Sequence, residues 1–312
     1  MAELSTRPLT PGDLGAVAEL FNLAAKAGGG YDGVTAEELE SLFGSIIADP
    51  ATDTRLLYEP GGMLVAAAMV PAAPPGGFRV DLFGAVHPDR HGRGIGRELM
   101  AWSLRHAAAL RAAHAPGAEW VAEASIFIDD LPTARLFRRF GFTPVRYWFE
   151  MLAPAVRRDV EPYPDGLRTV AYGPEWETAL HEAHMEAFDD HWGYQKRDLE
   201  SWAGFTTRSA GFRPDLSRLV LDGETIAAYL LSYVDADPER VYIGQVGTRR
   251  PWRRRGIAGR LLVEVLSAAA AAGLRSAALS VDADSPTGAV GVYERAGFAV
   301  ESRSVAYQRP VD

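Results

Sequence analysis

The stretch Val246–Leu266 reads VGTRRPWRRRGIAGRLLVEVL, and it decides the fold. An apolar strand ends in a basic turn, and glycines then open an apolar helix. Glycine lets the backbone approach a ligand closely, and a helix N-terminus adds positive potential at the same point. The pattern therefore predicts a site for a phosphate-bearing ligand. The turn lacks the Gly-Lys-Ser/Thr of a Walker A loop and the glycine spacing of a dinucleotide-binding turn, so neither of those sites is indicated.

A second copy of this stretch occurs earlier, where Val86–Leu104 reads VHPDRHGRGIGRELMAWSL. Two further pairs of segments repeat in the same order, one around Arg7 and Arg168 and one ending at Phe142 and Phe298. Such self-similarity indicates a duplicated domain, and 312 residues is an ordinary length for two domains. We expect an N-terminal domain over 1–153, a proline-rich linker over 154–164 and a C-terminal domain over 165–312.

Each half predicts the same order of elements, and the sequence therefore predicts an α+β fold. A strand leads to an amphipathic helix and a looser helical segment, and three strand runs follow before the glycine turn and its helix. One more strand and a short helix ending in Gly-Phe complete each half. We expect a mixed, mostly antiparallel, twisted sheet flanked by helices in each domain. The predicted strand runs are 55–58, 63–70, 80–86 and 120–127, then 217–221, 225–233, 241–246 and 277–281.

Composition narrows the function classes. The formal net charge is −9, with 32 basic and 41 acidic residues, which argues against a nucleic-acid partner. Cysteine is absent, so disulfides, thiolate nucleophiles and cysteine-based metal sites are excluded, and we expect no metal site. The N-terminus shows no signal pattern and no apolar run reaches transmembrane length. We expect a cytoplasmic protein with no membrane partner, as a monomer or a homodimer.

The basic turn resembles the acetyl-CoA signature of the GNAT acetyltransferases, Arg/Gln-x-x-Gly-x-Gly/Ala after a strand. Arg253-x-x-Gly256-x-Ala258 matches it in full, whereas His91-x-x-Gly94-x-Gly96 departs at its first position. The segment Leu279–Phe298 resembles the second conserved block of the family. It departs by one extra residue and by Ser285 and Pro286 where an asparagine is usual. The resemblance covers nearly the whole chain, and the tandem arrangement is similar to mycothiol synthase and related tandem acetyltransferases.

This resemblance implies that acetyl-CoA is the acyl donor and that the turn and the strand before it hold the donor. The residues implied in the C-terminal half are Val246, Gly247, Thr248, Arg253, Arg254, Arg255, Gly256, Ile257, Ala258 and Gly259. Those implied in the N-terminal half, where occupancy stays open, are Val86, His87, Gly92, Arg93, Gly94, Ile95, Gly96 and Arg97.

The resemblance also implies that Tyr293 is the general acid, and the alternative for this residue is a packed core tyrosine. Phe137 occupies the matching position of the first half and has no proton to donate, so we expect the second half to be catalytic. Related enzymes often use a glutamate on the strand before the turn as general base, and residues 241–246 hold no carboxylate. Glu239, Asp282 and Asp284 lie nearby in sequence, and Asp81 lies on the matching strand of the first half.

The segment Ala187–Gln195 is expected to cover the acceptor, because the loop between the first two helices does so in this family. Asp190, His191 and Trp192 are the candidate acceptor-binding residues, through charge pairing, proton transfer and contact between a cation and a ring. The alternative for this segment is a polar connecting loop. The first-half counterpart, Leu23–Gly33, is rich in glycine.

The expected function is transfer of an acetyl group from acetyl-CoA to a primary amine of a small molecule. No cysteine and no Gly-x-Ser-x-Gly motif is present, so direct transfer in a ternary complex is expected in place of a covalent acyl-enzyme. Three alternatives stay open: a non-catalytic protein that senses acyl-CoA, an acetyltransferase for a peptide amine, and an enzyme for a longer acyl donor.

Overall fold

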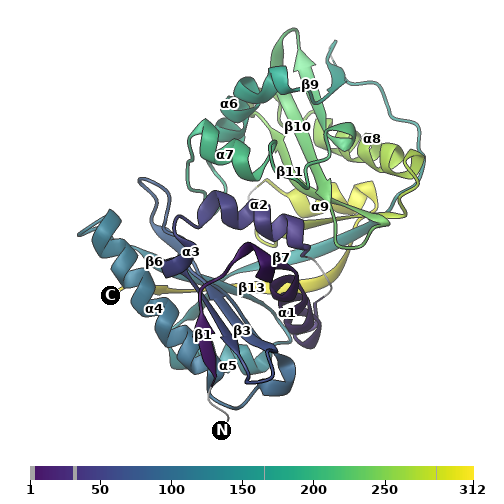
Figure 1. Ribbon diagram of the computed structural model, residues 1–312. Coiled ribbons are helices and arrows are strands. Elements are labelled where there is room, and N and C mark those ends of the chain that lie inside the picture. The colour runs from purple at the N-terminus through teal and green to yellow at the C-terminus, as the bar shows by residue number, and fades with distance from the viewer. Residues whose placement is uncertain (1–3, 31–33, 165, 286) are drawn as a thin grey trace. The chain divides into compact units, whose positions relative to one another are not determined.

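A computed structural model describes residues 4–30, 34–164, 166–285 and 287–312 of the chain. It divides into two compact units (Figure 1): the first contains Met1–Tyr147 and Arg303–Asp312, and the second contains Trp148–Ser302. Each unit combines mostly antiparallel strands with flanking helices, so the predicted α+β class is confirmed. Pro286 and the end of the glycine-rich stretch, 31–33, lie outside the described residues. In the described part of the chain, no helix is both long and apolar enough to cross a bilayer.

The first unit contains two groups of paired strands. Antiparallel pairs join β1, β2, β3 and β5 in that order, whereas β4 runs parallel to β6, which pairs antiparallel with the end of β13. The strands are β1 (Ser5–Arg7), β2 (Thr54–Tyr58), β3 (Leu64–Met69), β4 (Arg79–Asp81), β5 (Phe83–Val86), β6 (Val121–Phe127) and β13 (Ala299–Pro310). The α-helices are α1 (Leu14–Ala27), α2 (Ala36–Ile46), α3 (Pro50–Asp53), α4 (Ile95–His114) and α5 (Leu131–Arg139), and short 3₁₀ turns span Pro11–Asp13 and Pro88–Arg90.

The second unit contains one sheet in the order β7-β12-β11-β10-β9-β8, in which β11 and β12 are parallel and the other pairs are antiparallel. The strands are β7 (Thr143–Pro154), β8 (Arg168–Ala171), β9 (Arg218–Asp222), β10 (Thr225–Val234), β11 (Arg240–Thr248) and β12 (Ser276–Asp282). The α-helices are α6 (Glu177–Ala187), α7 (Leu199–Phe205), α8 (Ile257–Ala271) and α9 (Ala289–Ala296), and 3₁₀ turns span Pro174–Trp176, Pro214–Leu216 and Arg250–Trp252.

The sheet of the second unit buries both faces. Figure 1 shows α6 and α7 on one side of strands β9 to β11 and α8 on the other. Leu261 and Val265 of α8 pack against Leu230, whereas Trp202 of α7 packs against Tyr229 on the opposite face. Successive residues of a strand point to opposite faces of the sheet. The side chains of β10 therefore pack alternately into the core on the α8 side and the core on the α6 and α7 side.

Most predicted strand runs are confirmed to within two residues at either end. The run 80–86 is the informative exception, because it forms two strands with different partners. Its first part, β4, pairs with β6, and its second part, β5, pairs with β3. At the junction, the Leu82 N–H donates to the carbonyl oxygen of Glu123 over 2.7 Å.

Two long strands were not predicted, β7 and β13, and they cross the sequence-order division of the chain. Residues 148–154 of β7 pair with β12 in the second unit, and residues 304–310 of β13 pair with β6 in the first. The units therefore differ from the expected boundaries at 153 and 165. The physical reason is that an open strand edge offers hydrogen bonds to any strand that reaches it, whatever its place in the chain.

Candidate active site

The site of the second unit begins where two parallel strands separate. The ladder between β11 and β12 runs from Arg240 and Ser276 to Tyr242 and Ala278, and both strands continue beyond it. Opposite this point, β10 pairs with residues on either side of Gly244 and skips that residue, which makes it a bulge. A bulge bends and re-aims its strand. The main chain over 243–248 therefore turns away from β12 and leaves an opening in the sheet.

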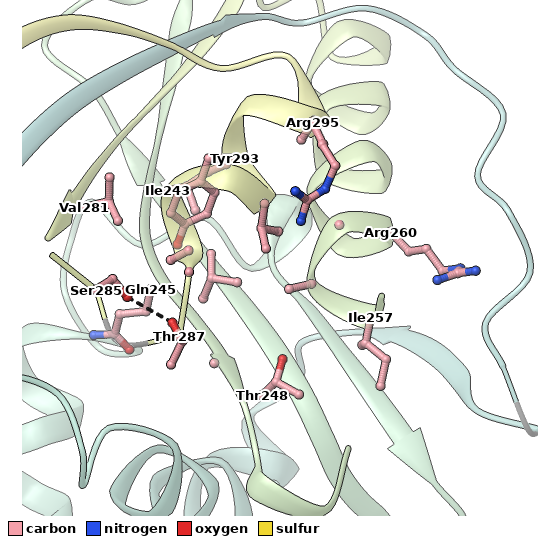
Figure 2. Close-up of a pocket in the computed structure, with 18 of the residues that line it drawn as sticks. Ile243, Gln245, Thr248, Ile257, Arg260, Val281, Ser285, Thr287, Tyr293 and Arg295 are labelled. Atoms are coloured by element: carbon pink, nitrogen blue, oxygen red, sulfur yellow. Dashed lines mark hydrogen bonds between the residues drawn. The ribbon is translucent and has the colours of Figure 1, made fainter. Parts of the chain in front are cut away.

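A cavity of about 1200 Å³ occupies this opening. Small-molecule sites typically measure roughly 300–1,000 Å³, so this cavity suits a long ligand. Figure 2 shows its lining, which comes from β11, the first turn of α8, the end of β12 and helix α9. Another part of the cavity is closed by Trp148 of β7 and by the segment after α6, through Ala187, Phe188, Asp190 and His191.

The loop between β11 and α8 is held in an unusual backbone conformation. Gly256 is left-handed with φ 74°, and so is Arg254 with φ 62°. A residue with a side chain pays about 1–2 kcal/mol for that conformation, and such strain concentrates at functional sites. Turns of this kind point main-chain N–H groups into a concave anion site, here next to the N-terminus of α8. Of the predicted loop residues, Arg253, Arg254 and Gly256 to Gly259 line the cavity, whereas Arg255 does not.

Three arginines of this loop are paired with carboxylates at the end of α6 and just after it. Ion pairs join Arg249 to Glu186 at 2.6 Å, Arg250 to Asp189 at 3.2 Å and Arg253 to Asp190 at 2.6 Å. The hydrogen bond from Arg253 holds the pKa of the Asp190 carboxyl below its usual range. Arg253 also donates to the carbonyl oxygens of Thr248 and Ala187. Its side chain thus joins the segment after α6 to the loop before α8. Arg254 and Arg260 are further cations of the lining.

Tyr293 projects from α9 into the cavity, with its hydroxyl directed inward (Figure 2). Burial raises its pKa to about 12, so the hydroxyl keeps its proton at neutral pH. Its ring packs edge-on against Phe298 at 6.1 Å between centroids. Both descriptions of this residue, a proton donor and a packed ring, fit its position.

Aromatic rings line the acceptor side of the cavity. His191 stacks on Trp148 at 5.8 Å between ring centroids, and Trp192 meets the same indole edge-on at 6.4 Å. The structure thus brings Asp190 and His191 into the cavity lining, whereas Trp192 is not among the residues that line it. Trp148 was missed by the sequence reasoning because its strand was not predicted, although the run 143–154 is rich in β-formers.

Gln245 supplies an unusual polar atom. Its Oε1 is buried and, within the described residues, has no hydrogen-bond partner. Gln245 lines the cavity at the separated part of β11, as Figure 2 shows. Buried acceptors are nearly always paired, so this oxygen calls for a ligand N–H or a water. Two side chains of the lining, Ser285 and Thr287, are joined by a 2.9 Å hydrogen bond.

Gly247 lines the cavity and is also constrained by packing. A Cβ on Gly247 would lie 2.4 Å from the ring of Tyr229, so that glycine is required for packing against β10. The Tyr229 hydroxyl is 2.8 Å from Nδ1 of His184, and burial lowers the pKa of His184 to about 3. This imidazole is therefore neutral and belongs to the core between α6 and the sheet. His181 donates from Nε2 to the carbonyl oxygen of Arg197.

The carboxylates considered for the general base have different surroundings. Glu239 pairs with Arg275 at 2.8 Å, outside the cavity lining. Asp282 lines the cavity and accepts a hydrogen bond from the N–H of Asp284 at 3.0 Å. In the first unit, Asp81 pairs with Arg79 at 3.1 Å.

The corresponding turn of the first unit has the same backbone form. Gly92 and Gly94 are left-handed, with φ 77° and 85°, at the positions of Arg254 and Gly256. His91 lies 3.1 Å from the carbonyl oxygen of Val86, which repeats the contact between Arg253 and Thr248. The predicted residues Val86 to Arg97 therefore build the same strand-turn-helix.

The surroundings of this first turn differ from those of the second. Gly28 to Gly30 lie against the end of β6, and a Cβ on Gly30 would be 2.1 Å from the ring of Phe127. Phe137 is buried, with Phe142 and Tyr307 each at 5.4 Å between ring centroids. In the first unit, therefore, Gly28 to Gly30 pack on the end of β6, and a buried phenyl ring stands at the position of Tyr293.

Comparison with known proteins agrees with this geometry. The acetyltransferase (GNAT) family matches residues 176–298, and an acetyltransferase (GNAT) domain matches residues 52–144. A mycothiol acetyltransferase from Tsukamurella paurometabola is 30% identical over 249 residues, covering 75% of this chain and 80% of that protein.

Solved structures show the same tandem arrangement. A GCN5-related N-acetyltransferase from Sphaerobacter thermophilus has a TM-score of 0.81 at 28% identity, over 100% of this chain and 97% of that one. A tandem GNAT protein from the clavulanic acid biosynthesis pathway has a TM-score of 0.73 at 18% identity, over 99% of both chains, and shows the fold. The chain is an N-acetyltransferase and belongs to the GNAT acetyltransferase family, with two GNAT domains in tandem.

Proposed function

We propose that the second unit transfers an acetyl group from acetyl-CoA to a primary amine of a small molecule, directly and within a ternary complex. The observation that carries this proposal is one continuous cavity that joins three features. These are the separated strand β11, the left-handed loop at the start of α8, and the half-buried side chain of Tyr293.

The residues of the cavity fit the parts of the donor. When bound, acetyl-CoA supplies an acetyl group activated as a thioester. Arg254 and the main chain of Gly256 to Gly259 would hold its pyrophosphate at the N-terminus of α8. Main-chain N–H groups near Val246 would polarise the thioester carbonyl, because β12 does not pair with β11 there. The unpaired Oε1 of Gln245 would accept from an amide N–H of the donor.

The proposed acid and base lie on different elements of the cavity, Tyr293 on α9 and His191 after α6. Tyr293, with a pKa of about 12, keeps a proton at neutral pH and gives it to the sulfur as the carbon–sulfur bond breaks. The amine must lose a proton to form the new carbon–nitrogen bond. His191 lines the acceptor side and offers an imidazole nitrogen for that proton. The product amide and free CoA then leave without a covalent enzyme intermediate.

The acceptor is placed by charge and by rings. The stacked rings of Trp148 and His191 offer an apolar wall to the acceptor, and the carboxylate of Asp190, which is paired with Arg253, lines the same cavity. The Tsukamurella enzyme is named a mycothiol acetyltransferase, so its name suggests a candidate acceptor. We therefore place the free amine of the mycothiol family first among the acceptors to be tried.

The first unit is proposed to be non-catalytic, because Phe137 replaces the tyrosine and the loop at Gly28 to Gly30 packs on Phe127. Residues Val86, His87 and Gly92 to Arg97 are where a second donor molecule would bind.

Calorimetric titration of the protein with acetyl-CoA, together with turnover on a panel of amines, tests the proposal. One site per chain and acetylation of a small amine would support it, and two sites would add donor binding by the first unit. The panel includes peptide amines and longer acyl-CoA donors. A preference for either of them would replace the acceptor or donor named here, and absence of acetyl-CoA binding would overturn the proposal.

A further inference from the structure

The chain segment after β7 contributes to the cavity of the second unit. Arg158, Asp159, Val160 and Glu161 all line the cavity, beside the first turns of α8 and the end of α9. This segment lies in the part of the chain that the sequence marks only as a connection, rich in proline. The segment is therefore more than a connection, because its residues form part of the cavity wall.

Specific hydrogen bonds fix the segment along α8. The N–H of Arg158 donates to Oγ of Ser267 over 2.8 Å, and that hydroxyl donates back to the Arg158 carbonyl over 2.9 Å. Further along, the hydroxyl of Tyr163 donates to Glu264 over 2.9 Å, and Nε of Arg260 donates to the carbonyl oxygen of Pro162 over 3.1 Å. The segment is therefore tied to α8 at several points, and Arg158 has a defined place.

Positive charge gathers where this segment meets the two helices. Arg158 donates to the carbonyl oxygen of Ala296 over 3.2 Å, and Arg295 is the neighbouring residue on α9. Arg260 of α8 forms an ion pair with Glu161 at 3.2 Å, and the Glu161 side chain is 81% exposed. An ion pair so open to water contributes little and readily gives way to a phosphate. Three guanidinium groups against two carboxylates, those of Asp159 and Glu161, leave this part of the cavity cationic.

The orientation of the donor follows from the proposed function. The thioester end lies between β11 and Tyr293, and the pyrophosphate lies at the loop before α8. The adenosine end, with its separate 3′-phosphate, must then extend past this loop. It would lie between α8 and α9, where the segment 158–161 forms the wall. Guanidinium groups bind phosphates through paired, charge-assisted hydrogen bonds.

We propose that Arg158 binds the 3′-phosphate of acyl-CoA, together with Arg260 and Arg295. The connecting segment is thereby part of the donor site, and it selects CoA over analogues that lack this phosphate. The inference rests on the proposed function, because it takes the loop at Gly256 as the pyrophosphate site.

Calorimetric titration of the full chain with CoA and with 3′-dephospho-CoA tests this inference by binding alone. The wild-type protein is expected to bind CoA more tightly than the analogue. Arg158→Gln should lower the affinity for CoA about tenfold and leave the affinity for dephospho-CoA unchanged, since one charged hydrogen-bonding group is lost. Arg158→Lys keeps the charge and should keep part of the preference.

Arg157→Gln is the matched control, because Arg157 is an exposed arginine one residue earlier that does not line the cavity. It should bind both ligands as the wild type does. If Arg158→Gln weakens both ligands equally, or neither, the inference is wrong while the donor site stands. If the wild-type protein binds neither ligand, the proposed function itself fails. An unchanged thermal unfolding temperature for Arg158→Gln shows that a lost preference comes from the site and not from misfolding.

Discussion

The turns at Gly94 and Gly256 are copies of one structure with different surroundings. Both have two left-handed residues before a helix, but the first uses Gly92 where the second uses Arg254. Glycine pays nothing for that conformation, whereas an arginine there is strained. The first turn therefore has this backbone form without strain. In the second turn Arg254 is strained, and its guanidinium lies in the wall of the cavity.

The same contrast holds for the residues around the turns. His91 and Arg253 each contact the last carbonyl of the preceding strand, so this hydrogen bond belongs to the fold and not to the chemistry. The hydroxyl of Tyr293 has no counterpart at Phe137, which lies packed between two rings. The strand-turn-helix is therefore kept in both copies as a folding unit, whereas the aromatic residue at the position of Tyr293 differs between them.

The largest expected effect tests the difference between the two aromatic positions. Tyr293→Phe removes the proposed proton donor and keeps the ring, so kcat should fall about 100-fold. The affinity for acetyl-CoA, measured by titration, should stay within about twofold, because the hydroxyl acts on the leaving sulfur and not on the loop. Unchanged turnover would reduce Tyr293 to a packing residue.

The next effect tests the difference between the two turns. Gly256→Ala forces a left-handed alanine whose Cβ would lie 2.5 Å from Nη1 of Arg260. Relaxing that strain costs about 1–2 kcal/mol, so acetyl-CoA affinity should fall about tenfold. Gly94→Ala is the matched variant, with φ 85°, and should leave turnover unchanged. A loss of turnover in the Gly94 variant would show that the first unit takes part in the reaction.

A third prediction compares how each unit secures its first strand. Asp13 accepts hydrogen bonds from Arg7 at 2.6 Å, from Tyr58 at 2.8 Å and from Thr10 at 2.9 Å, and its side chain is 8% exposed. The matching arginine of the second unit, Arg168, pairs with Glu224, whose side chain is 85% exposed. Asp13→Asn should lower the free energy of unfolding by about 2 kcal/mol. Glu224→Gln should change it by about 0.5 kcal/mol or less.

The pH dependence sharpens this prediction. The hydrogen bond from Arg7 holds the pKa of Asp13 well below its usual range, so the carboxylate stabilises the folded state above the unfolded pKa of about 4. That contribution is lost as the pH falls towards the lower, folded pKa. Denaturant unfolding at pH 7 and pH 3 should show the gap between wild type and Asp13→Asn narrowing in acid. A gap that widens in acid would contradict the assignment.

The smallest expected effect tests whether the first unit can regain chemistry. Phe137→Tyr in the Tyr293→Phe background should not restore turnover, because residue 137 is buried and packed against the rings of Phe142 and Tyr307. The measurement is the kcat of the double variant against that of Tyr293→Phe alone. Recovery of activity would show that the first unit retains a working donor site and needs only the proton donor.

The sequence alone determined the features that depend on neighbouring residues. The duplication, the α+β class, the strand runs and both glycine turns follow from local periodicity and from the backbone freedom of glycine. Tyr293 was chosen through the resemblance to the second conserved block of the GNAT family, in which a tyrosine is commonly the general acid. Asp190 and His191 were chosen for their chemistry and their place in a loop, and both line the cavity.

Which distant segments lie next to one another became clear from the tertiary structure alone. Strand pairing depends on which edge is open, so β7 and β13 could not be assigned to their units from chain order. Trp148 and Arg158 enter the cavity for the same reason, and nothing local marks either one. The sequence predicts Arg253 as a donor-binding residue, and only the structure shows that it also pairs with Asp190, 63 positions away. Local propensity acts over a few residues, whereas hydrogen-bonded edges and ion pairs act through space, and the site is built from both.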